Sequence, residues 1–270
     1  MPSSDLQNQV RQLIEEANAL RVDGKWSQAI TVYSQIISIA PTFAPAYVER
    51  GLLVCEMGDP ERAFHDFEKA IKLDPQYGPA YYGRGWVKHY RGNFKGEMED
   101  AGKGLLLDRE NAGMYYRRIG AAQQGLEQYH DAIETYNQAI SFYSGQDEGT
   151  IYNRGLCYLE IEDYPSALAD FNQCLEMDPD WAWAFAARAR TYLALNNCEK
   201  AIADCDRAII IQPAYEYSYL WRALAYETLG DKKKARKDFE QILRITKSDR
   251  LKSIARQHLQ TLKSVWGWFG

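Results

Sequence analysis

The chain has 270 residues, of which 13% are aromatic, and a formal net charge of −5. It contains no stretch near the roughly 18 apolar residues of a membrane-spanning helix, and residues 1–9 lack the apolar core of a secretory signal. The five cysteines form no Cys-x-x-Cys pair, so we expect buried, reduced thiols and a cytoplasmic protein.

One pattern of large, small and turn-forming residues returns seven times, with a period of 34 residues. This self-similarity predicts an all-α solenoid in which each helix–turn–helix unit buries its apolar face against its neighbours. We expect a lead-in over residues 1–9, one continuous array over residues 10–249, and a capping helix with an aromatic tail over residues 250–270. The seven repeats are predicted over residues 10–43, 44–77, 78–112, 113–147, 148–181, 182–215 and 216–249.

Small residues mark the place where the two helices of each repeat should approach closely. The eighth position of every repeat holds alanine or glycine, and twelve positions later six of the seven repeats have alanine, the exception being Glu97. Large residues at neighbouring positions would pack against these small ones without voids. Proline ends most repeats because it cannot continue a helix; these residues are Pro41, Pro75, Pro179 and Pro213.

These residues resemble the tetratricopeptide repeat family, and residues 44–77 carry nearly every feature of its motif. The resemblance implies a right-handed superhelix of antiparallel helix pairs, whose first helices line a concave groove that binds protein segments. It implies no chemistry of its own. Because the four histidines lack metal-ligand spacing and no phosphate-binding loop occurs, we expect a non-catalytic scaffold or adaptor without metal or cofactor.

The family resemblance places the second, fifth, ninth and twelfth positions of each first helix in the groove. Here those positions are mostly apolar and aromatic, with a few arginines, and these residue types are frequent binding hot spots. The alternative is that several of them pack on neighbouring helices and never meet a partner. The residues predicted to bind a partner are Tyr82, Trp86, His89, Tyr90, Arg117, Tyr152, Leu156, Trp183 and Arg190.

Some family members hold the C-terminal carboxylates of heat-shock chaperones with a clamp of lysine and asparagine residues. In this chain Ile14 stands where the first lysine should be, and Glu49 replaces an asparagine. Pro79 and Gly83 replace the distal basic residues. A carboxylate beside Glu49 would be repelled, so the sequence argues against a chaperone tail as the partner.

Arginine in the seventh position and aspartate in the twenty-third occur together in the same five repeats. We interpret them as partners in charge-assisted hydrogen bonds that fix the helix register, rather than as a site for nucleic acid or an acidic ligand. The predicted pairs are Arg50 with Asp66, Arg84 with Asp100, Arg154 with Asp170, Arg188 with Asp204, and Arg222 with Asp238.

The third repeat departs most from the pattern. Lys88 replaces an apolar residue, Glu97 replaces the packing alanine, and Gly104 leaves room where other repeats have bulk. We interpret this as a degenerate repeat whose gaps are filled by Tyr115 and Tyr116. The alternative is a hinge, or a side pocket lined by Trp86, Lys88, Glu97 and Tyr116.

The C-terminal part is basic, with 11 Lys and Arg against 4 Asp and Glu in residues 231–264. The basic run at residues 232–237 is typical of a solvated helix face and only a weak indication of nucleic-acid binding. After it, apolar residues recur at helical spacing and predict an amphipathic capping helix. The tail from Trp266 to Phe269 has two alternative roles: contact with a membrane surface, where tryptophan is favoured, or docking into the groove of a second copy, which would make a homo-oligomer.

Overall fold

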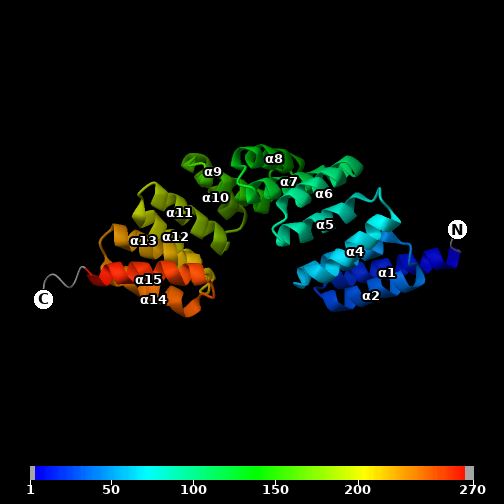
Figure 1. The fold of residues 1–270 in the computed structure, drawn as a ribbon, viewed down its shortest axis with the longest axis horizontal. Helices are drawn as coiled ribbons and strands as arrows, with labels where there is room; N and C mark the ends of the chain where they lie inside the picture. Colours follow the sequence, from blue (N-terminus) through cyan, green and yellow to red (C-terminus); the bar gives the residue numbers. More distant parts are fainter. Residues whose placement is uncertain (1–3, 265–270) are drawn as a thin grey trace. The chain divides into compact units, whose positions relative to one another are not determined.

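The computed structural model describes residues 4–264, which form fifteen α-helices and one short 3-10 helix and contain no strand (Figure 1). The all-α prediction is therefore confirmed. The aromatic tail from Trp266 to Phe269 lies outside the described residues. Fourteen of the helices form seven pairs: α1 (Ser4–Val22) with α2 (Trp26–Ile39), α3 (Ala44–Glu56) with α4 (Pro60–Leu73), α5 (Gly78–Tyr90) with α6 (Phe94–Leu107), α7 (Ala112–Gly125) with α8 (Tyr129–Phe142), α9 (Glu148–Glu160) with α10 (Tyr164–Met177), α11 (Ala182–Ala194) with α12 (Cys198–Ile211), and α13 (Glu216–Thr228) with α14 (Lys232–Ile245).

The helix pairs belong to two compact units, residues 1–144 (unit 1) and residues 145–270 (unit 2). The single continuous array over residues 10–249 stays a prediction. The division falls at a turn in which Ser144 and Gly145 both have positive φ, whereas most other repeats end at a proline. Within each unit every helix packs on the next one along the chain.

Close approach between the helices of a pair depends on the small eighth residue. A Cβ atom built on Gly51 would lie 2.8 Å from the Phe67 ring, and one on Gly120 would lie 2.7 Å from the Tyr136 ring. Real side chains do not approach that closely, so any larger residue would push the two helices apart. Packing of large residues against small ones is thus how each pair closes its core.

All five predicted arginine–aspartate pairs are present, each as two parallel hydrogen bonds with N–O distances between 2.5 and 2.9 Å. Each pair joins the first helix of a repeat to its second helix. In addition, Arg50 donates to Ser34 and Arg188 donates to Asn172, which lie in the preceding repeats. The guanidinium groups therefore fix the register both within and between helix pairs.

The third repeat is filled largely as expected, with one correction. The Tyr115 ring occupies the space beside Gly104, where an added Cβ atom would lie 2.3 Å from it. Tyr116 does not fill this repeat, because its ring packs on Phe142 of α8 at a centroid distance of 5.8 Å. The packing alanine is replaced by a fully buried carboxylate, that of Glu97.

Helix α15 (Asp249–Ser264) covers the C-terminal end of unit 2 and confirms the predicted capping helix. Leu251 and Ala255 are buried against Phe239 and Ile242 of α14. The His258 ring stacks on Phe239, and its Nδ1 atom lies 2.6 Å from a Glu227 carboxylate oxygen. The described residues contain no further repeat after α14. Helix α15 instead covers the last helix pair with its apolar side chains.

Candidate protein-binding face

Aromatic side chains follow one another across the first helices of unit 2. We call the six residues concerned the aromatic ladder: Tyr152 on α9, Trp181 before α11, Trp183 on α11, Tyr215 before α13, and Tyr217 and Trp221 on α13.

Two rings of the ladder come from the residues that immediately precede a first helix. Trp181 and Tyr215 occupy the N-cap positions of α11 and α13 with extended backbone, and neither side chain caps the helix by a hydrogen bond. The second helices differ, since residues such as Asp163 and Asn197 accept a hydrogen bond from the backbone at their N-caps. At α11 and α13 the N-cap position therefore supplies a ring for packing, whereas at α9 the Asp147 side chain accepts a hydrogen bond from the backbone.

The rings of the ladder form two groups of contacts, one between Tyr152 and Trp181 and one that runs from Trp183 to Trp221. The Tyr152 and Trp181 centroids are 4.9 Å apart, those of Trp183 and Tyr215 are 6.4 Å apart, and those of Tyr217 and Trp221 are 6.0 Å apart. Such distances and tilts are those of favourable aromatic pairs. Trp183 is 46% exposed and Tyr217 is 37% exposed, whereas the other four members of the ladder are half-buried.

Burial also changes the acidity of the ladder's hydroxyl groups. Burial raises the pKa of Tyr152 to about 12. It also raises the pKa of Tyr215, and the neighbouring Tyr152 adds to that effect. These hydroxyl groups are consequently neutral hydrogen-bond donors at physiological pH.

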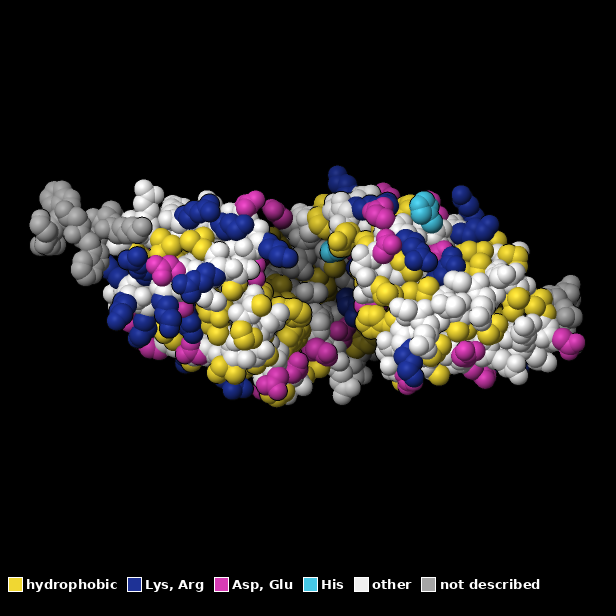
Figure 2. Space-filling view, turned by 90° about the horizontal axis from the view of Figure 1, so that it is seen from below, with side chains coloured by type: hydrophobic (Ala, Val, Ile, Leu, Met, Phe, Trp, Pro, Cys, Tyr) yellow, Lys and Arg dark blue, Asp and Glu magenta, His cyan; other side chains and the backbone are white. Residues whose placement is uncertain are grey.

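The other two predicted binding residues of unit 2 border the ladder. Leu156 is half-buried and packs on the cluster around Phe171. Arg190 lies over the Trp221 ring at 5.7 Å, and its Nη1 atom donates to Glu160 at 2.8 Å. The Arg190 charge is thus already paired within the chain. On the face of the molecule shown in Figure 2, hydrophobic side chains cover part of unit 2, and Lys and Arg gather toward its C-terminal end.

In unit 1, Tyr82 and Trp86 line a cavity of about 490 Å³ at the first helices of neighbouring repeats. Trp86 is half-buried, whereas Tyr82 is buried and its hydroxyl oxygen accepts hydrogen bonds from Arg117 and Arg118 at 3.2 and 3.4 Å. Burial alone would raise the pKa of Tyr82, but the two guanidinium groups outweigh it, and the pKa lies below its ordinary value. The remaining cavity residues are Arg21, Trp26, Leu52, Leu53 and Glu56.

His89 and Tyr90 lie at the end of α5 in different surroundings. Tyr90 is 73% exposed, whereas the His89 Nδ1 atom lies 2.7 Å from a carboxylate oxygen of Glu97. Glu97 is fully buried and also accepts a hydrogen bond from Arg118 at 3.3 Å, while Lys88 pairs with Asp100. Ion pairs therefore occupy the place where the sequence allowed a side pocket as the alternative interpretation. His89 is the partner of a buried carboxylate.

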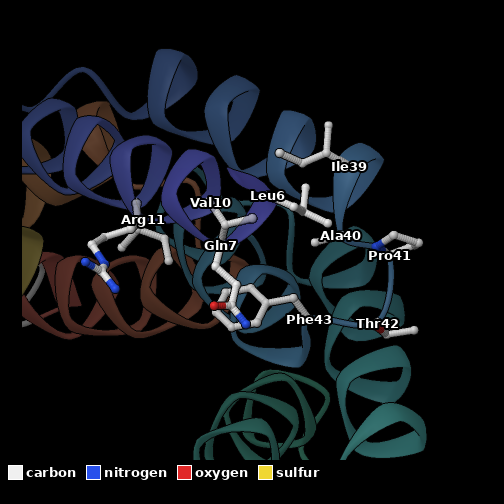
Figure 3. Close-up of a pocket in the computed structure, with 10 residues that line it drawn as sticks. Leu6, Gln7, Val10, Arg11, Ile39, Ala40, Pro41, Thr42 and Phe43 are labelled. Carbon is white, nitrogen blue, oxygen red and sulfur yellow. The ribbon is translucent and has the colours of Figure 1, made fainter. Parts of the chain in front are cut away.

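A second cavity of unit 1, of about 640 Å³, lies at its N-terminal edge (Figure 3). Side chains of α1, including Leu6 and Val10, line it together with Phe43 and Pro41 from the connection between α2 and α3. The lining is mostly apolar. This cavity could not be predicted from the repeat pattern. The pattern assigns recurring positions of the first helices to the groove, whereas this cavity lies at the end of the helix stack.

Residues 4–264 contain no group of three His, Cys, Asp or Glu residues that could hold a metal ion. None of the helices in this range has the length and apolar character needed to cross a bilayer. All five cysteines are free thiols, and all except Cys55 are buried, which agrees with the expected buried, reduced state for four of them.

Sequence reasoning missed Trp181, Tyr215 and Trp221 of the ladder. The first two carry a readable signal, because an aromatic residue directly precedes the first helix at Phe43, Tyr77, Trp181 and Tyr215, in step with the 34-residue period. Trp221 has no such counterpart in the other repeats. Recognising the ladder from the sequence required these cap positions to be read together with the groove positions.

Comparisons with known proteins agree with the repeat pattern. Sequence models of the tetratricopeptide repeat match residues 44–77, 150–180 and 186–250. A segment of 66 residues is 41% identical to the heat shock protein sti1 homolog of Schizosaccharomyces pombe, and it covers 23% of this chain but only 10% of that protein.

Two solved structures are similar in fold. The Cut9–Hcn1 hetero-tetramer of the APC/C gives a TM-score of 0.80 at 17% identity, over 91% of this chain and 48% of that chain. YrrB, described as a TPR protein with an unusual peptide-binding site, gives a TM-score of 0.53 at 28% identity, over 69% of this chain and 95% of that chain. From its repeated motif, its stacked helix pairs and these matches, the chain belongs to the tetratricopeptide repeat superfamily.

Proposed function

We propose that the protein is a non-catalytic scaffold that binds an apolar or amphipathic protein segment on the first helices of its repeats. The observation that carries the proposal is the aromatic ladder, in which the exposed side chains of Trp183 and Tyr217 lie next to half-buried aromatic neighbours. Contiguous exposed apolar area of this kind usually marks an interaction site. The likeness to YrrB supports a peptide as the ligand, because that protein is described as having a peptide-binding site.

We further propose that the partner is not the carboxylate tail of a chaperone, despite the local likeness to the sti1 homolog. The small cavity at the corresponding position is lined by Ile14, Asn18 and Glu49. Burial raises the pKa of Glu49, and Arg21, which binds it at 2.9 Å, opposes that shift. With its nearest cation already engaged, the Glu49 carboxylate would repel a second carboxylate.

Affinity capture followed by mass spectrometry would test the scaffold proposal. The test variant combines Trp86→Ala with Trp183→Ala, and the matched control combines Leu106→Ala with Ile210→Ala. The control residues are 71% and 70% exposed but lie on the second helices α6 and α12. We expect partners to be lost from the tryptophan variant and retained by the control. An unchanged partner set in the tryptophan variant would reject binding by these helices.

Self-association is a second candidate, and the N-terminal cavity is the observation that favours it. Its apolar lining, which includes Leu6, Val10 and Phe43, is open at the end of the helix stack. Light scattering on wild type and on Val10→Glu would test this candidate. We expect a concentration-dependent rise in mass for wild type only, and a monomer mass for both proteins would exclude self-association through the cavity.

A further inference from the structure

The groups that the aromatic ladder offers to a ligand are neutral. Its exposed members are Trp183 and Tyr217, which carry an indole N–H and a hydroxyl group. Neither of these two polar groups has a hydrogen-bond partner among the described residues. The bordering charges of Arg190 and Glu160 form an ion pair, and Glu216, which lies between Tyr215 and Tyr217 in the chain, accepts a hydrogen bond from Thr246. By charge complementarity, the ligand is an uncharged segment that has flat apolar surfaces and free hydrogen-bond acceptors.

The spacing of the ladder restricts the ligand further. Its rings come from α9, α11 and α13, and α11 contacts both of the others. Packed helices lie roughly 8–10 Å apart. A polyproline II helix has three residues per turn and rises about 3.1 Å per residue, so it presents the same face about every 9 Å. An extended segment that crosses these helices can therefore place one residue of the same face at each of them.

We propose that the aromatic ladder binds a proline-rich segment in the polyproline II conformation. This inference rests on the proposed scaffold function and names the chemical class of its ligand. Pyrrolidine rings pack on aromatic faces, and the carbonyl groups of this helix have no internal hydrogen bonds. They can accept hydrogen bonds from the Trp183 indole and the tyrosine hydroxyl groups. The segment is also stiff before it binds, which lowers the entropic cost of association.

An amphipathic helix fits the ladder less well. Such a helix lays an apolar stripe into a smooth groove and is about 10–12 Å wide with its side chains. In the ladder Trp183 and Tyr217 are exposed, and the rings of Tyr215 and Tyr217 are tilted by 48° to each other. Exposed, tilted rings favour a thin ligand whose own rings pack on them.

The test uses the full chain and three synthetic peptides: acetylated nonaproline amide, a Gly-Ser peptide of the same length, and an amphipathic Leu-Lys peptide of about 18 residues, which is long enough to form a helix. Binding is followed by calorimetry and by the tryptophan fluorescence. We expect saturable nonaproline binding with a dissociation constant between about 10 µM and 1 mM, and at least about tenfold weaker binding of the other two peptides. No saturation with nonaproline, or equal or tighter binding of the Leu-Lys helix, would overturn the proposal.

Variants locate the binding on the ladder. Trp183→Ala combined with Tyr217→Ala should weaken nonaproline binding at least about tenfold, while Ile210→Ala combined with Leu229→Ala should leave it unchanged. The control residues are 70% and 50% exposed and lie outside the ladder. Trp183→Phe keeps a ring and should retain most of the affinity if the fold is intact. Nonaproline binding that both double variants retain would overturn the proposal.

The two proposals fail in distinguishable ways. If the Trp86→Ala and Trp183→Ala double variant loses its captured partners but nonaproline does not bind, the scaffold function stands and the proline preference is wrong. If nonaproline binds the ladder and that double variant keeps all captured partners, the ligand class stands and the cellular partner binds elsewhere.

Discussion

Removing one carboxylate from an arginine–aspartate pair should destabilise unit 2 strongly. In the pair of Arg188 and Asp204, two hydrogen bonds of 2.7 Å join α11 to α12, and Arg188 also donates to Asn172 of the preceding repeat at 2.7 Å. The substitution Asp204→Ala deletes both bonds to α12 and leaves the guanidinium without its counter-charge. Because these bonds hold the two helices in register, the loss should affect their packing as well.

The expected magnitude follows from the exposure of the pair. Its side chains are 19% and 9% exposed, which is close to the buried limit, where deleting one partner costs roughly 3–5 kcal/mol. Partial access of water to Arg188 places the estimate at the lower end, about 3 kcal/mol, or roughly a 150-fold change in the unfolding equilibrium. The exposed pair of Arg207 and Asp180, 3.9 Å apart, provides the matched control, because such a pair contributes about 0–1 kcal/mol.

Urea unfolding and amide hydrogen exchange would measure the effect. We expect Asp204→Ala to lower the unfolding midpoint and to accelerate exchange in α11 and α12, with Asp180→Ala close to wild type. The double substitution of Arg188→Met with Asp204→Leu should recover much of the loss, because an apolar pair leaves no buried charge. A cost below about 1 kcal/mol for Asp204→Ala would refute the reasoning, since the pair would then behave as an exposed one.

Two further predictions concern packing and pH. Gly104→Ala should destabilise unit 1 by about 1–3 kcal/mol, because the added Cβ atom would lie 2.3 Å from Tyr115. Gly102→Ala, with no atom within 4 Å, should stabilise the same helix by up to about 1 kcal/mol; thermal unfolding that gave both changes the same sign would contradict this account. Burial raises the pKa of the Cys174 thiol to about 12 from 9.0. The folded chain therefore keeps a proton that the unfolded chain loses above pH 9, and stability falls as the pH rises. Between about pH 8 and 9.5 this thiol should contribute roughly 0.5–1 kcal/mol of that fall, and urea unfolding of Cys174→Ala should show a correspondingly smaller pH dependence than wild type.

The features that could be predicted from the sequence are those that recur at fixed positions. Arg188 and Asp204 were paired correctly because both members of such a pair are present, or both absent, in every repeat. The close approach at Gly51 and Gly120 was likewise predictable, since one steric requirement returns with every helix pair. Periodicity supplied the fold because it reports interactions that are made many times in the same geometry.

Features that occur once could not be predicted in the same way. Glu97 looked like a packing defect, because the other six repeats have alanine at its position. Its partners His89 and Arg118 lie 8 and 21 residues away in the chain, and no other repeat makes these contacts at that position. The boundary between the two units lies at a turn in which Ser144 and Gly145 both have positive φ, and no other connection between described repeats has such a pair. At the ladder, Trp183 was identified from its position in the repeat, whereas Trp221 has no equivalent to compare.

This contrast explains how one repeat can serve for both stability and recognition. The paired guanidinium groups, such as that of Arg188, hold neighbouring helices in register from inside the stack. The second and fifth positions of the first helices take no part in those bonds and can vary without loss of register. In unit 1 the ring of Tyr82 is held by two arginines, and in unit 2 the ring of Trp183 is held by Tyr215. Each unit thus fixes its rings before a partner arrives, which spares about 0.5–1.5 kcal/mol for each side chain that would otherwise be immobilised on binding.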